Sequence, residues 1–328
     1  MASDSRHSRI TDRVSTRLKL KQLRLLVAIS ERMSILHAAR DLNISQPAAT
    51  KLVKDLETDF GVVLFDRTNR GVVPTAYGAA LVRHGKLILA QIAQAAQELD
   101  DLSEGTGGRV VVGTLLAASA ALLPAAIRAL HADRPNVTIA IREGTNDVLM
   151  PALRLGDVDM VVGRLPEYRH RAEVIQESLF PEEIRVVARP GHPLGGKQAV
   201  GFDRLAGENW ILPPPDTTLR RQIDREFLDR GLAPPANALE SVSFLTNRTL
   251  LADTDFLAAF PHHVIRNDVD DGRLCVIRCE LNRVAIPVGV SYRRHGGLSP
   301  AAAGFLDRLR QVAVDLQRRP EYGTSFIG

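Results

Sequence analysis

From residue 109 onward, strand-like and helix-like segments alternate along the chain. RVVVGTLL, NVTIAIREG and VDMVVGRL are rich in β-branched residues, whereas LLPAAIRALHADRP and DVLMPALRLGD have the spacing of amphipathic helices. Strands that alternate with helices in this way form parallel βαβ units. Further segments of both kinds follow through residue 318, so the sequence predicts an α/β domain over residues 109–328.

A long helix and a short hinge are expected before that domain. Residues 103–108 read SEGTGG, the composition of a flexible linker. Residues 75–102 carry apolar or bulky side chains at spacings of four, three, four, four, three and four, close to a heptad seam: Tyr77, Leu81, His84, Ile88, Ile92, Ala95 and Leu99. The spacing predicts that this helix pairs with its copy in a second subunit. A core helix of one globule is the alternative, although the segment is long for that.

Residues 37–57, HAARDLNISQPAATKLVKDLE, predict two short helices separated by Asn43-Ile44. Ser45 is a good N-cap for the second helix, and Pro47 falls in its first turn, where the missing N–H costs nothing. At 100° per residue, one side of that helix collects Ala48, Ala49, Leu52, Val53 and Leu56. The other side collects Gln46, Pro47, Thr50, Lys51 and Lys54. The pattern favours a helix-turn-helix with an exposed polar face, and a solvated face on an ordinary packing helix is the alternative.

A hairpin follows directly. VVLFDRTNRGVVPT reads as a strand over 62–65, a tight turn over 67–71 and a strand over 72–73, with Arg67 and Arg70 at the tip. Such a wing reaches the phosphate backbone or the minor groove of DNA. Residues 17–74 are therefore expected to form a winged helix-turn-helix domain.

The charge distribution supports an anionic partner for this head alone. Residues 1–74 hold 13 Lys/Arg and 8 Asp/Glu, a net charge of +5, and the remaining 29 and 30 give −1, which together make the +4 of the whole chain. Residues 1–16 are charged with no apolar stretch behind them, which predicts a disordered tail and not a secretory signal. No run of 18 apolar residues occurs, so we expect no membrane partner and a cytoplasmic location.

The sequence favours neither an enzyme nor a cofactor or metal site. The nine histidines are scattered, and no Gly-x-Ser-x-Gly elbow, dinucleotide-binding glycine motif or phosphate-binding Gly-Lys-Ser/Thr loop is present. Cys275 and Cys279 are four residues apart in a β-like segment, the wrong spacing for a zinc knuckle. A buried, reduced pair is expected for these cysteines, with a redox sensor as the alternative.

The chain resembles the LysR-type transcriptional regulators essentially end to end. In the head, HAARDLNISQPAATKLVKDLETDFGVVLFDRTNRGVVPTAYG combines AA, L, SQPA, LE, G, LF, R, PT and G at the spacings of that family. VGTLLAASAALLP, RLGDVDMVVG, GHPL and AAFPHHV fit the second half. The residues around GVVPTAYG and GTLLAAS are similar to those of the sub-group that includes galactose-binding-protein and protocatechuate-pathway regulators.

The resemblance implies a specific architecture and set of partners. It implies an α/β protein with an N-terminal winged helix-turn-helix, a long dimerising linker helix and a two-lobed, periplasmic-binding-protein-like effector domain. Lobe I is expected at about 109–165 and 270–320, and lobe II at about 166–269. The implied partners are operator DNA, a small-molecule inducer (a sugar or an organic or aromatic acid), RNA polymerase and further copies of the chain, as a dimer or tetramer. The family's glycine-rich turn is replaced by ADTDF at 252–256.

On the DNA side, four residues match the family's base-reading positions: Gln46, Pro47, Thr50 and Lys51. Amide and ammonium groups can pair with purine edges, and Thr and Pro can contact a thymine methyl. Lys54, Arg67 and Arg70 are assigned to phosphates, which position the head without reading sequence.

On the effector side, the site is expected at the carboxyl ends of the parallel strands, between the lobes. The candidate residues are Ser119, Thr145, Asn146, Asp216, Thr217 and Phe244. Simple helix capping is the alternative for each Ser or Thr. Arg142 or Arg164 would matter for an acidic inducer, and Asn146, Asp147 and Asp216 for a sugar, and the sequence leaves this open. An architectural DNA-binding protein without an effector remains the alternative function.

Overall fold

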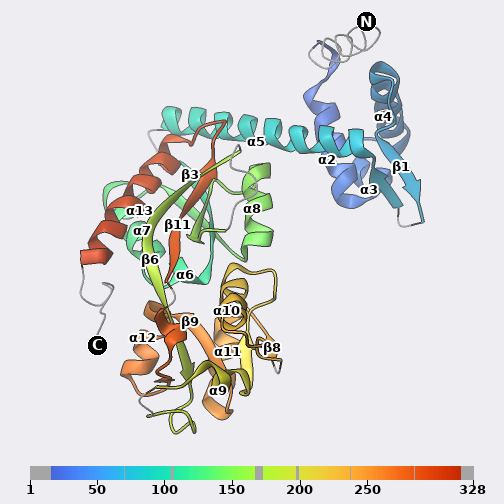
Figure 1. The fold of residues 1–328 in the computed structure, drawn as a ribbon. Helices are drawn as coiled ribbons and strands as arrows, with labels where there is room; N and C mark the ends of the chain where they lie inside the picture. The colour runs from blue at the N-terminus through green and yellow to red at the C-terminus, as the bar shows by residue number, and fades with distance from the viewer. Residues whose placement is uncertain are drawn as a thin grey trace, which may run out of the picture. The chain divides into compact units, whose positions relative to one another are not determined.

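The computed structural model describes residues 16–69, 71–104, 107–166, 173–196, 199–236, 238–283 and 285–318. Its contacts divide the chain into two compact units, Met1–Ala96 and Gln97–Gly328, each of which is described by itself (Figure 1). The expected tail falls almost entirely outside the described residues. No described helix is long and apolar enough to cross a membrane.

The first unit is a helix-turn-helix followed by a hairpin. Its helices are α2 (Leu20–Arg32), α3 (Ile35–Asp41) and α4 (Gln46–Phe60), and β1 (Phe65–Thr68) pairs antiparallel with β2 (Gly71–Pro74). Ser34 and Ser45 are the N-caps of α3 and α4, with each hydroxyl accepting a backbone N–H three residues on at 3.4 Å. Pro47 lies in the first turn of α4, as predicted.

The three helices of this unit share one apolar core. Its buried members from these helices are Leu25, Leu26 and Ile29 of α2, Ala38 and Ala39 of α3, and Ala49, Val53, Leu56 and Phe60 of α4, and Leu64, Phe65 and Val82 complete it. The two alanines carry only a methyl group, so α3 can approach its neighbours closely. One sequence expectation is wrong here, because Ala48 is exposed and not part of the buried side of α4.

The linker helix α5 spans Ala76–Glu104 and so runs two residues into the segment expected to be a hinge. Residues 105–106 of that segment lie outside the described part. Four large apolar side chains of the predicted seam are exposed, among them Tyr77 at 62% and Leu99 at 67%. Ile88 and Ile92 are the other two, at 41% and 37%. The seam is thus open to a partner in the single chain, as pairing requires.

The first lobe of the second unit is built around three strands, β3 (Arg109–Thr114), β4 (Thr138–Glu143) and β5 (Met160–Arg164), and β3 runs parallel to the other two. The helices are α6 (Leu116–Ser119), α7 (Leu122–Asp133), α8 (Asn146–Leu155) and α13 (Pro300–Arg318). Helices α7 and α13 pack together on one face of the sheet, and α8 lies on the other face (Figure 1).

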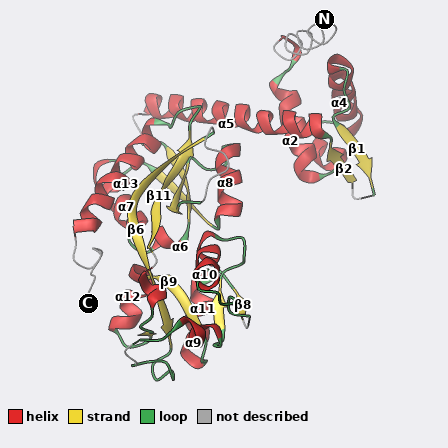
Figure 2. Ribbon diagram, in the orientation of Figure 1, coloured by secondary structure: helices red, strands yellow, loops and turns green. Residues whose placement is uncertain are grey.

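The second lobe repeats the layered arrangement on another sheet (Figure 2). Strand β7 (Trp210–Leu212) runs parallel to β8 (Ala238–Glu240) and β9 (Leu257–Pro261). The remaining elements are α9 (Phe202–Ala206), α10 (Thr218–Leu228), α11 (Phe244–Asp253), α12 (His262–Asp270), β10 (Cys275–Val276) and the 3₁₀ turn Glu280–Arg283. The single Trp of the chain, Trp210, is fully buried in this core.

Two strands, β6 (Val174–Ala188) and β11 (Ala285–Arg293), join the lobes (Figure 1). They pair antiparallel with each other, and two prolines, Pro181 and Pro287, face each other in the register. Beyond that point β6 pairs with β9 in the second sheet. The chain therefore passes from one lobe to the other within these two strands, and we call these two points the crossings.

The predicted lobe boundaries are wrong at both crossings. Residues 174–180 pair with β11 in the first lobe, whereas they were expected in the second. Residues 274–283 contribute Leu274, Ile277 and Leu281 to the cores of the second lobe, whereas they were expected in the first. Continuous strands carry no turn signal at these crossings, so the boundary is invisible in the sequence pattern.

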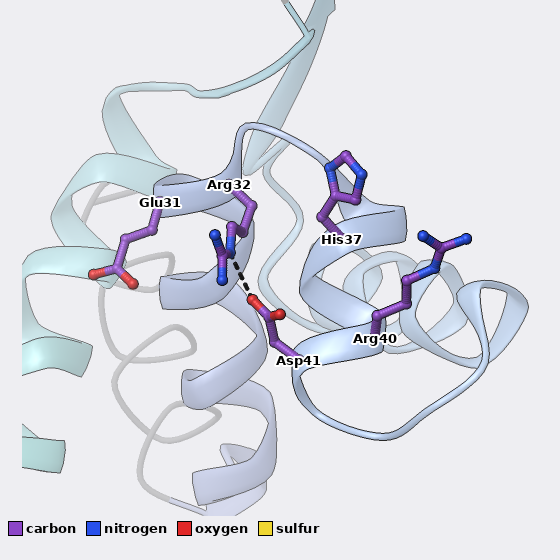
Figure 3. A pocket seen from close by; sticks show the side chains of 5 residues that line it. All are labelled: Glu31, Arg32, His37, Arg40 and Asp41. Carbon is purple, nitrogen blue, oxygen red and sulfur yellow. Dashed lines mark hydrogen bonds and ion pairs between the residues drawn. The ribbon is translucent and has the colours of Figure 1, made fainter.

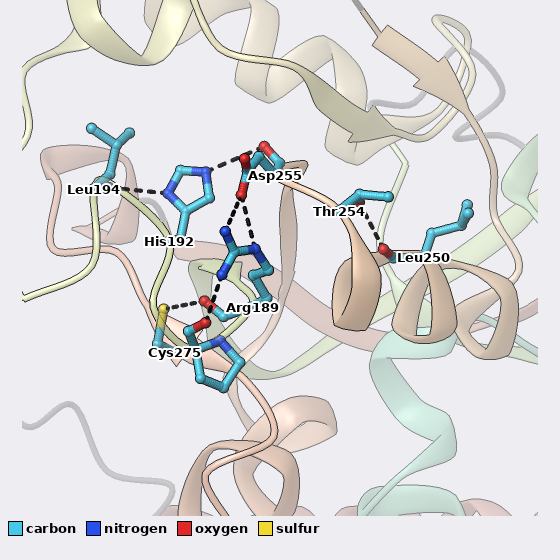
Figure 4. A network of polar contacts seen from close by, with 8 residues as sticks. Arg189, His192, Leu194, Leu250, Thr254, Asp255 and Cys275 are labelled. Carbon is cyan, nitrogen blue, oxygen red and sulfur yellow. Dashed lines mark hydrogen bonds and ion pairs between the residues drawn. The ribbon is translucent and has the colours of Figure 1, made fainter.

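The ADTDF turn that departs from the family pattern is tied down by ion pairing in the second lobe (Figure 4). The Arg189 guanidinium donates from Nε to Asp255 Oδ1 at 2.8 Å, and the His192 ring contacts the Asp255 carbonyl oxygen at 3.2 Å. The Cys275 thiol donates to the Arg189 carbonyl oxygen at 3.1 Å, and burial raises the pKa of this thiol. Both cysteines pack against the same core, as free thiols.

Candidate functional sites

Helix α4 presents its polar side to solvent. Gln46, Pro47, Lys51 and Lys54 are exposed, and Thr50 is half-buried. Two caps and the apolar contacts of the opposite side hold the helix in place. A rigid helix with an amide, a hydroxyl and two ammonium groups on its free side has the groups that read and hold a DNA groove.

The hairpin that follows α4 in the chain supplies a further cationic side chain. Arg67 lies on β1 opposite Val72 and is exposed. Arg70, the second predicted phosphate contact, lies outside the described residues. Thr68 Oγ1 donates to the Gly71 carbonyl oxygen at 3.1 Å and closes the turn.

A surface hollow of about 480 Å³ lies between α2 and α3 and is lined by Glu31, Arg32, His37, Arg40 and Asp41 (Figure 3). Arg32 Nε donates to Asp41 Oδ2 at 2.7 Å, and this pair links the end of α2 to the end of α3. Both partners are solvent-exposed, so the pair orients the two helices more than it stabilises them. No hydrophobic or aromatic hydrocarbon side chain lines the hollow, which makes it a poor site for a small molecule.

The second unit holds a larger cavity of about 820 Å³ between its two lobes. From the first lobe come Leu115, Leu116, Ser119, Ala120, Glu143, Gly144, Thr145, Asn146, Val148 and Arg164. From the second come Ile211, Pro213, Thr217, Thr218, Leu219, Ser241, Val242, Ser243, Phe244, Leu245, Asn247, Ala259, Phe260, Pro261 and Val264. Most of these residues follow the carboxyl ends of β3, β4, β5, β7 and β8, where parallel sheets place their ligands.

Five of the six predicted effector residues line this cavity: Ser119, Thr145, Asn146, Thr217 and Phe244. The sixth, Asp216, does not line it. Asp216 is exposed in the turn before Thr217, because α10 begins with Thr217 as its N-cap and only the residues from there on turn toward the cavity. Arg142 and Asp147, considered for an acid and a sugar, are also exposed and outside the lining.

Several lining hydroxyl groups have structural partners. Ser119 Oγ donates to the Leu115 carbonyl oxygen at 3.2 Å, and Thr217 Oγ1 donates to the Pro214 carbonyl oxygen at 2.8 Å. Thr217 and Ser243 also cap α10 and α11. Thr145 is the N-cap residue of α8 but makes no side-chain cap. Capping therefore explains Thr217, whereas it does not explain Thr145.

Two asparagines at the cavity have buried amide oxygens without a hydrogen-bond partner among the described atoms. Asn146 Nδ2 donates to the Arg164 carbonyl oxygen at 2.9 Å and to Thr218 Oγ1 of the other lobe at 3.4 Å. Asn247 is 4% exposed, and its Nδ2 donates to the Ser241 carbonyl oxygen at 3.4 Å. A carbonyl oxygen can only accept, so each amide is fixed with its oxygen left over. Asn247 is a site residue that the sequence analysis missed.

A buried cluster of ionisable residues lies where the two lobes meet. Arg164 Nη2 at the end of β5 is 2.8 Å from Glu182 Oε2 in β6, with side chains 7% and 1% exposed. His263 Nδ1 of α12 is 3.5 Å from Glu182 Oε1, and His263 Nε2 lies 2.8 Å from the Ala117 carbonyl oxygen. Since that oxygen accepts, Nε2 carries the proton and Nδ1 faces the carboxyl group. Sequence reasoning considered Arg164 but missed Glu182 and His263.

Burial shifts the pKa values of this cluster strongly. It raises the pKa of Glu182 to about 7, against the opposing effect of the Arg164 guanidinium. It lowers the pKa of His263 to about 4. In both residues the neutral form is favoured, because a desolvated charge is costly.

Residues 20–79 match the bacterial regulatory helix-turn-helix protein, lysR family, and residues 103–314 match the LysR substrate binding domain. The groups of His, Cys, Asp and Glu in the described residues include none that could hold a metal ion.

Curated relatives extend over nearly the whole chain. The chain is 34% identical to the HTH-type transcriptional regulator GbpR of Azospirillum brasilense, over 93% of this chain and 90% of that protein. It is 30% identical to the HTH-type transcriptional regulator PcaQ of Agrobacterium fabrum, over 92% of this chain and 97% of that protein.

Solved structures share the fold. ArgP from Mycobacterium tuberculosis covers 90% of this chain at a TM-score of 0.67 and 20% identity, with 98% of its own length matched. CbnR, described as a LysR family transcriptional regulator, matches at a TM-score of 0.64 and 20% identity, over 90% of this chain and 99% of its own.

Proposed function

The chain belongs to the LysR family of bacterial helix-turn-helix regulators, and we propose that it binds operator DNA and controls the transcription of nearby metabolic or transport genes in response to a small molecule. The observation that carries this proposal is the exposed polar surface of α4, opposite a side that packs on the core through Ala49, Val53 and Leu56. That surface carries an amide, a hydroxyl and two ammonium groups, which can bind base edges and phosphates.

On DNA, α4 enters the major groove and its side chains divide into two roles. Gln46 and Lys51 pair with base edges, and Pro47 and Thr50 contact apolar edges. Lys54, Arg67 and Arg70 hold phosphates and fix the register of the head.

The seam on α5 pairs two chains, and the assembly is a dimer or a dimer of dimers. Tyr77, Ile88, Ile92 and Leu99 supply exposed apolar surface for this contact. A paired helix places two heads on one duplex, so that the operator has two half-sites.

The lobes of the second unit carry the signal. A ligand in the cavity touches both lobes and favours the lobe arrangement in which both sets of contacts are made. The paired linker helices respond by changing the spacing of the heads on DNA, which changes contacts with RNA polymerase. The protein works in the cytoplasm, and its function requires neither catalysis nor a cofactor.

Footprinting of the full-length chain on the DNA upstream of its own gene tests the function. We expect two protected half-sites separated by about one helical turn, 10 base pairs, or a multiple of it. Uniform protection without half-sites, or protection that is the same on a scrambled duplex, would contradict the proposal and favour an architectural DNA-binding protein.

A further inference from the structure

We propose that Arg164, Glu182 and His263 form a proton-dependent joint between the lobes, in which an ionised Glu182 holds the Arg164 guanidinium and a protonated Glu182 releases it for contacts in the cavity. This inference rests on the proposed function, because it treats the cavity as the effector site and the joint as part of the signal. It is independent of whether the effector is an acid or an uncharged molecule.

The cluster connects the cavity to the place where the chain passes between the lobes. Arg164 lines the cavity at the end of β5, and its carbonyl oxygen accepts a hydrogen bond from Asn146 Nδ2 at 2.9 Å. Glu182 does not line the cavity, and it directly follows Pro181, which faces Pro287 in the register of the two strands. A change in the contact between Arg164 and Glu182 therefore acts on the cavity wall and on the crossing together.

Contacts from both lobes converge on Glu182. Arg164 Nη2 of the first lobe lies 2.8 Å from Glu182 Oε2, and His263 Nδ1 of the second lobe lies 3.5 Å from Oε1. The other ring nitrogen of His263, Nε2, lies 2.8 Å from the Ala117 carbonyl oxygen of the first lobe. The three side chains are at most 7% exposed, so their positions depend on how the two lobes pack together.

The ion pair between Arg164 and Glu182 is close but poorly aligned. Nε and Nη2 of Arg164 and both carboxyl oxygens of Glu182 are buried atoms without a hydrogen-bond partner among the described atoms. A buried ion pair needs good geometry and further hydrogen bonds to offset the cost of removing both charges from water. The contact is therefore weakly held, and a proton on Glu182 or an acceptor atom in the cavity can replace it.

The protonation of Glu182 changes near neutral pH. Burial raises the pKa of Glu182 to about 7, and the Arg164 guanidinium acts in the opposite direction. A Glu182 that loses this cation therefore binds its proton more tightly. Burial lowers the pKa of His263 to about 4, so this ring stays neutral between pH 6 and 8. Glu182 is thus the member of the cluster that titrates in this range.

The other elements around Glu182 present the following groups. Ile286 of β11 lies opposite Glu182 in the register, and α6 contributes a backbone carbonyl oxygen. Glu183 and Arg185 follow on β6 and form an ion pair with each other. Burial lowers the pKa of His262, and Arg185 and Glu183 act on it in opposite directions. These groups are shared by the parent and by a variant at position 182, so a difference between the two proteins reports Glu182.

The pH dependence of operator binding tests the joint without a ligand. Glutamine at position 182 has the shape of the protonated side chain and cannot ionise. Affinities of the full-length proteins for the upstream duplex are measured by fluorescence anisotropy at pH 6, 7 and 8 and constant ionic strength. We expect the parent and Glu182→Gln to bind alike at pH 6, where Glu182 is mostly protonated, and to differ at least about fivefold at pH 8.

Glu240→Gln is the matched control, because Glu240 is exposed on β8 and lies outside the cavity lining. Its affinity relative to the parent should be the same at all three pH values. If the ratio between the parent and Glu182→Gln is likewise independent of pH while the parent prefers the upstream duplex, the inference is overturned and the regulator is retained. If the parent shows no preference over a scrambled duplex at any pH, the proposed function itself is rejected.

Hydrogen–deuterium exchange of the parent protein gives a second test that needs no variant. Exchange is compared at pH 6 and pH 8 after correction for the intrinsic rate of each amide. We expect peptides that span the crossings in β6 and β11 to change their protection between the two pH values, whereas a peptide that spans β7 in the second lobe keeps its protection. Equal protection of the crossings at both pH values would overturn the inference, even where Glu182→Gln does not fold.

Discussion

Two substitutions in the buried cluster, Glu182→Gln and His263→Gln, should change the slope of the free energy of unfolding against pH in opposite directions. In the parent protein, burial raises the Glu182 pKa from 4.5 to about 7 and lowers the His263 pKa from 6.5 to about 4. Burial is the largest cause of both pKa shifts, so each shift should survive removal of its neighbour. Glutamine preserves the approximate size of each side chain and cannot titrate.

Proton counting between pH 4.5 and 6.5 gives the expected slopes. In the unfolded chain Glu182 has lost its proton and His263 has gained one, whereas in the folded chain the proton is on Glu182 and His263 is neutral. Each state holds one proton on the pair, so the pair contributes almost no slope to the free energy of unfolding. In the parent protein, the effects of the two pKa shifts on the pH dependence of the free energy of unfolding therefore cancel.

When one residue is replaced, the effect of the other on the slope of the free energy of unfolding against pH becomes measurable. In Glu182→Gln only the lowered His263 pKa remains, so the unfolded state binds more protons and the free energy of unfolding rises with pH. In His263→Gln only the raised Glu182 pKa remains, the folded state binds more protons, and the free energy of unfolding falls with pH. Each slope reaches at most about 1.4 kcal/mol per pH unit, or about 3 kcal/mol across this window.

Urea unfolding at pH 4.5, 5.5 and 6.5, followed by tryptophan fluorescence, measures these slopes. Trp210 is the only tryptophan of the chain and is fully buried in the second lobe, so its signal reports the unfolding of the lobe that contains His263. Other groups that titrate in this range, including His262 with its lowered pKa, are shared by all three proteins and cancel when each variant is compared with the parent. Slopes equal to the parent's, or of the same sign in both variants, would refute the reasoning.

Three further outcomes are expected. Leu56→Ala should destabilise the head by about 2–5 kcal/mol, because Leu56 is fully buried in its core, and thermal unfolding of the full chain should show the loss. Ile92→Lys should shift the assembly toward smaller species in analytical ultracentrifugation, whereas Lys86→Ala, beside the seam on the same helix, should not. Arg67→Ala should weaken binding to all DNA sequences alike and lower the magnitude of the salt slope by about one, and a loss confined to the operator would contradict its assignment to a phosphate.

The sequence predicts the head well because its signals are local. Ser45, Pro47 and the apolar spacing of α4 act within one or two turns of helix, and the structure has the helix where these residues place it. The exposure of Ala48 is the exception, because a helical wheel contains no information on where the neighbouring helices end. The identity of the base contacts remains a prediction.

The cavity is only partly readable from sequence. Ser119, Thr145, Asn146 and Thr217 could be predicted, because residues that follow parallel strands meet at one edge of a sheet. Asn247 lies inside α11, about one turn past the start of the helix and seven residues past the end of β8, so the rule for residues at strand ends does not predict it.

The buried cluster depends on tertiary packing. Glu182 lies in the middle of β6, where a charged residue is expected on the exposed side of a strand. Its side chain is only 1% exposed, and Arg164 of β5 and His263 of α12 lie against it. The crossings at Pro181 and Pro287 are hidden for a related reason, because both strands continue without interruption from one sheet toward the other.

Specific binding to DNA tests the central claim most directly. Fluorescence anisotropy compares the upstream duplex with a scrambled duplex across a salt series, for the parent protein and for Lys51→Ala. We expect the parent to prefer the upstream duplex strongly and Lys51→Ala to lose about 1–3 kcal/mol of that preference while retaining most of its binding to scrambled DNA. Equal, strongly salt-dependent binding of the parent to both duplexes would contradict the claim that α4 reads sequence.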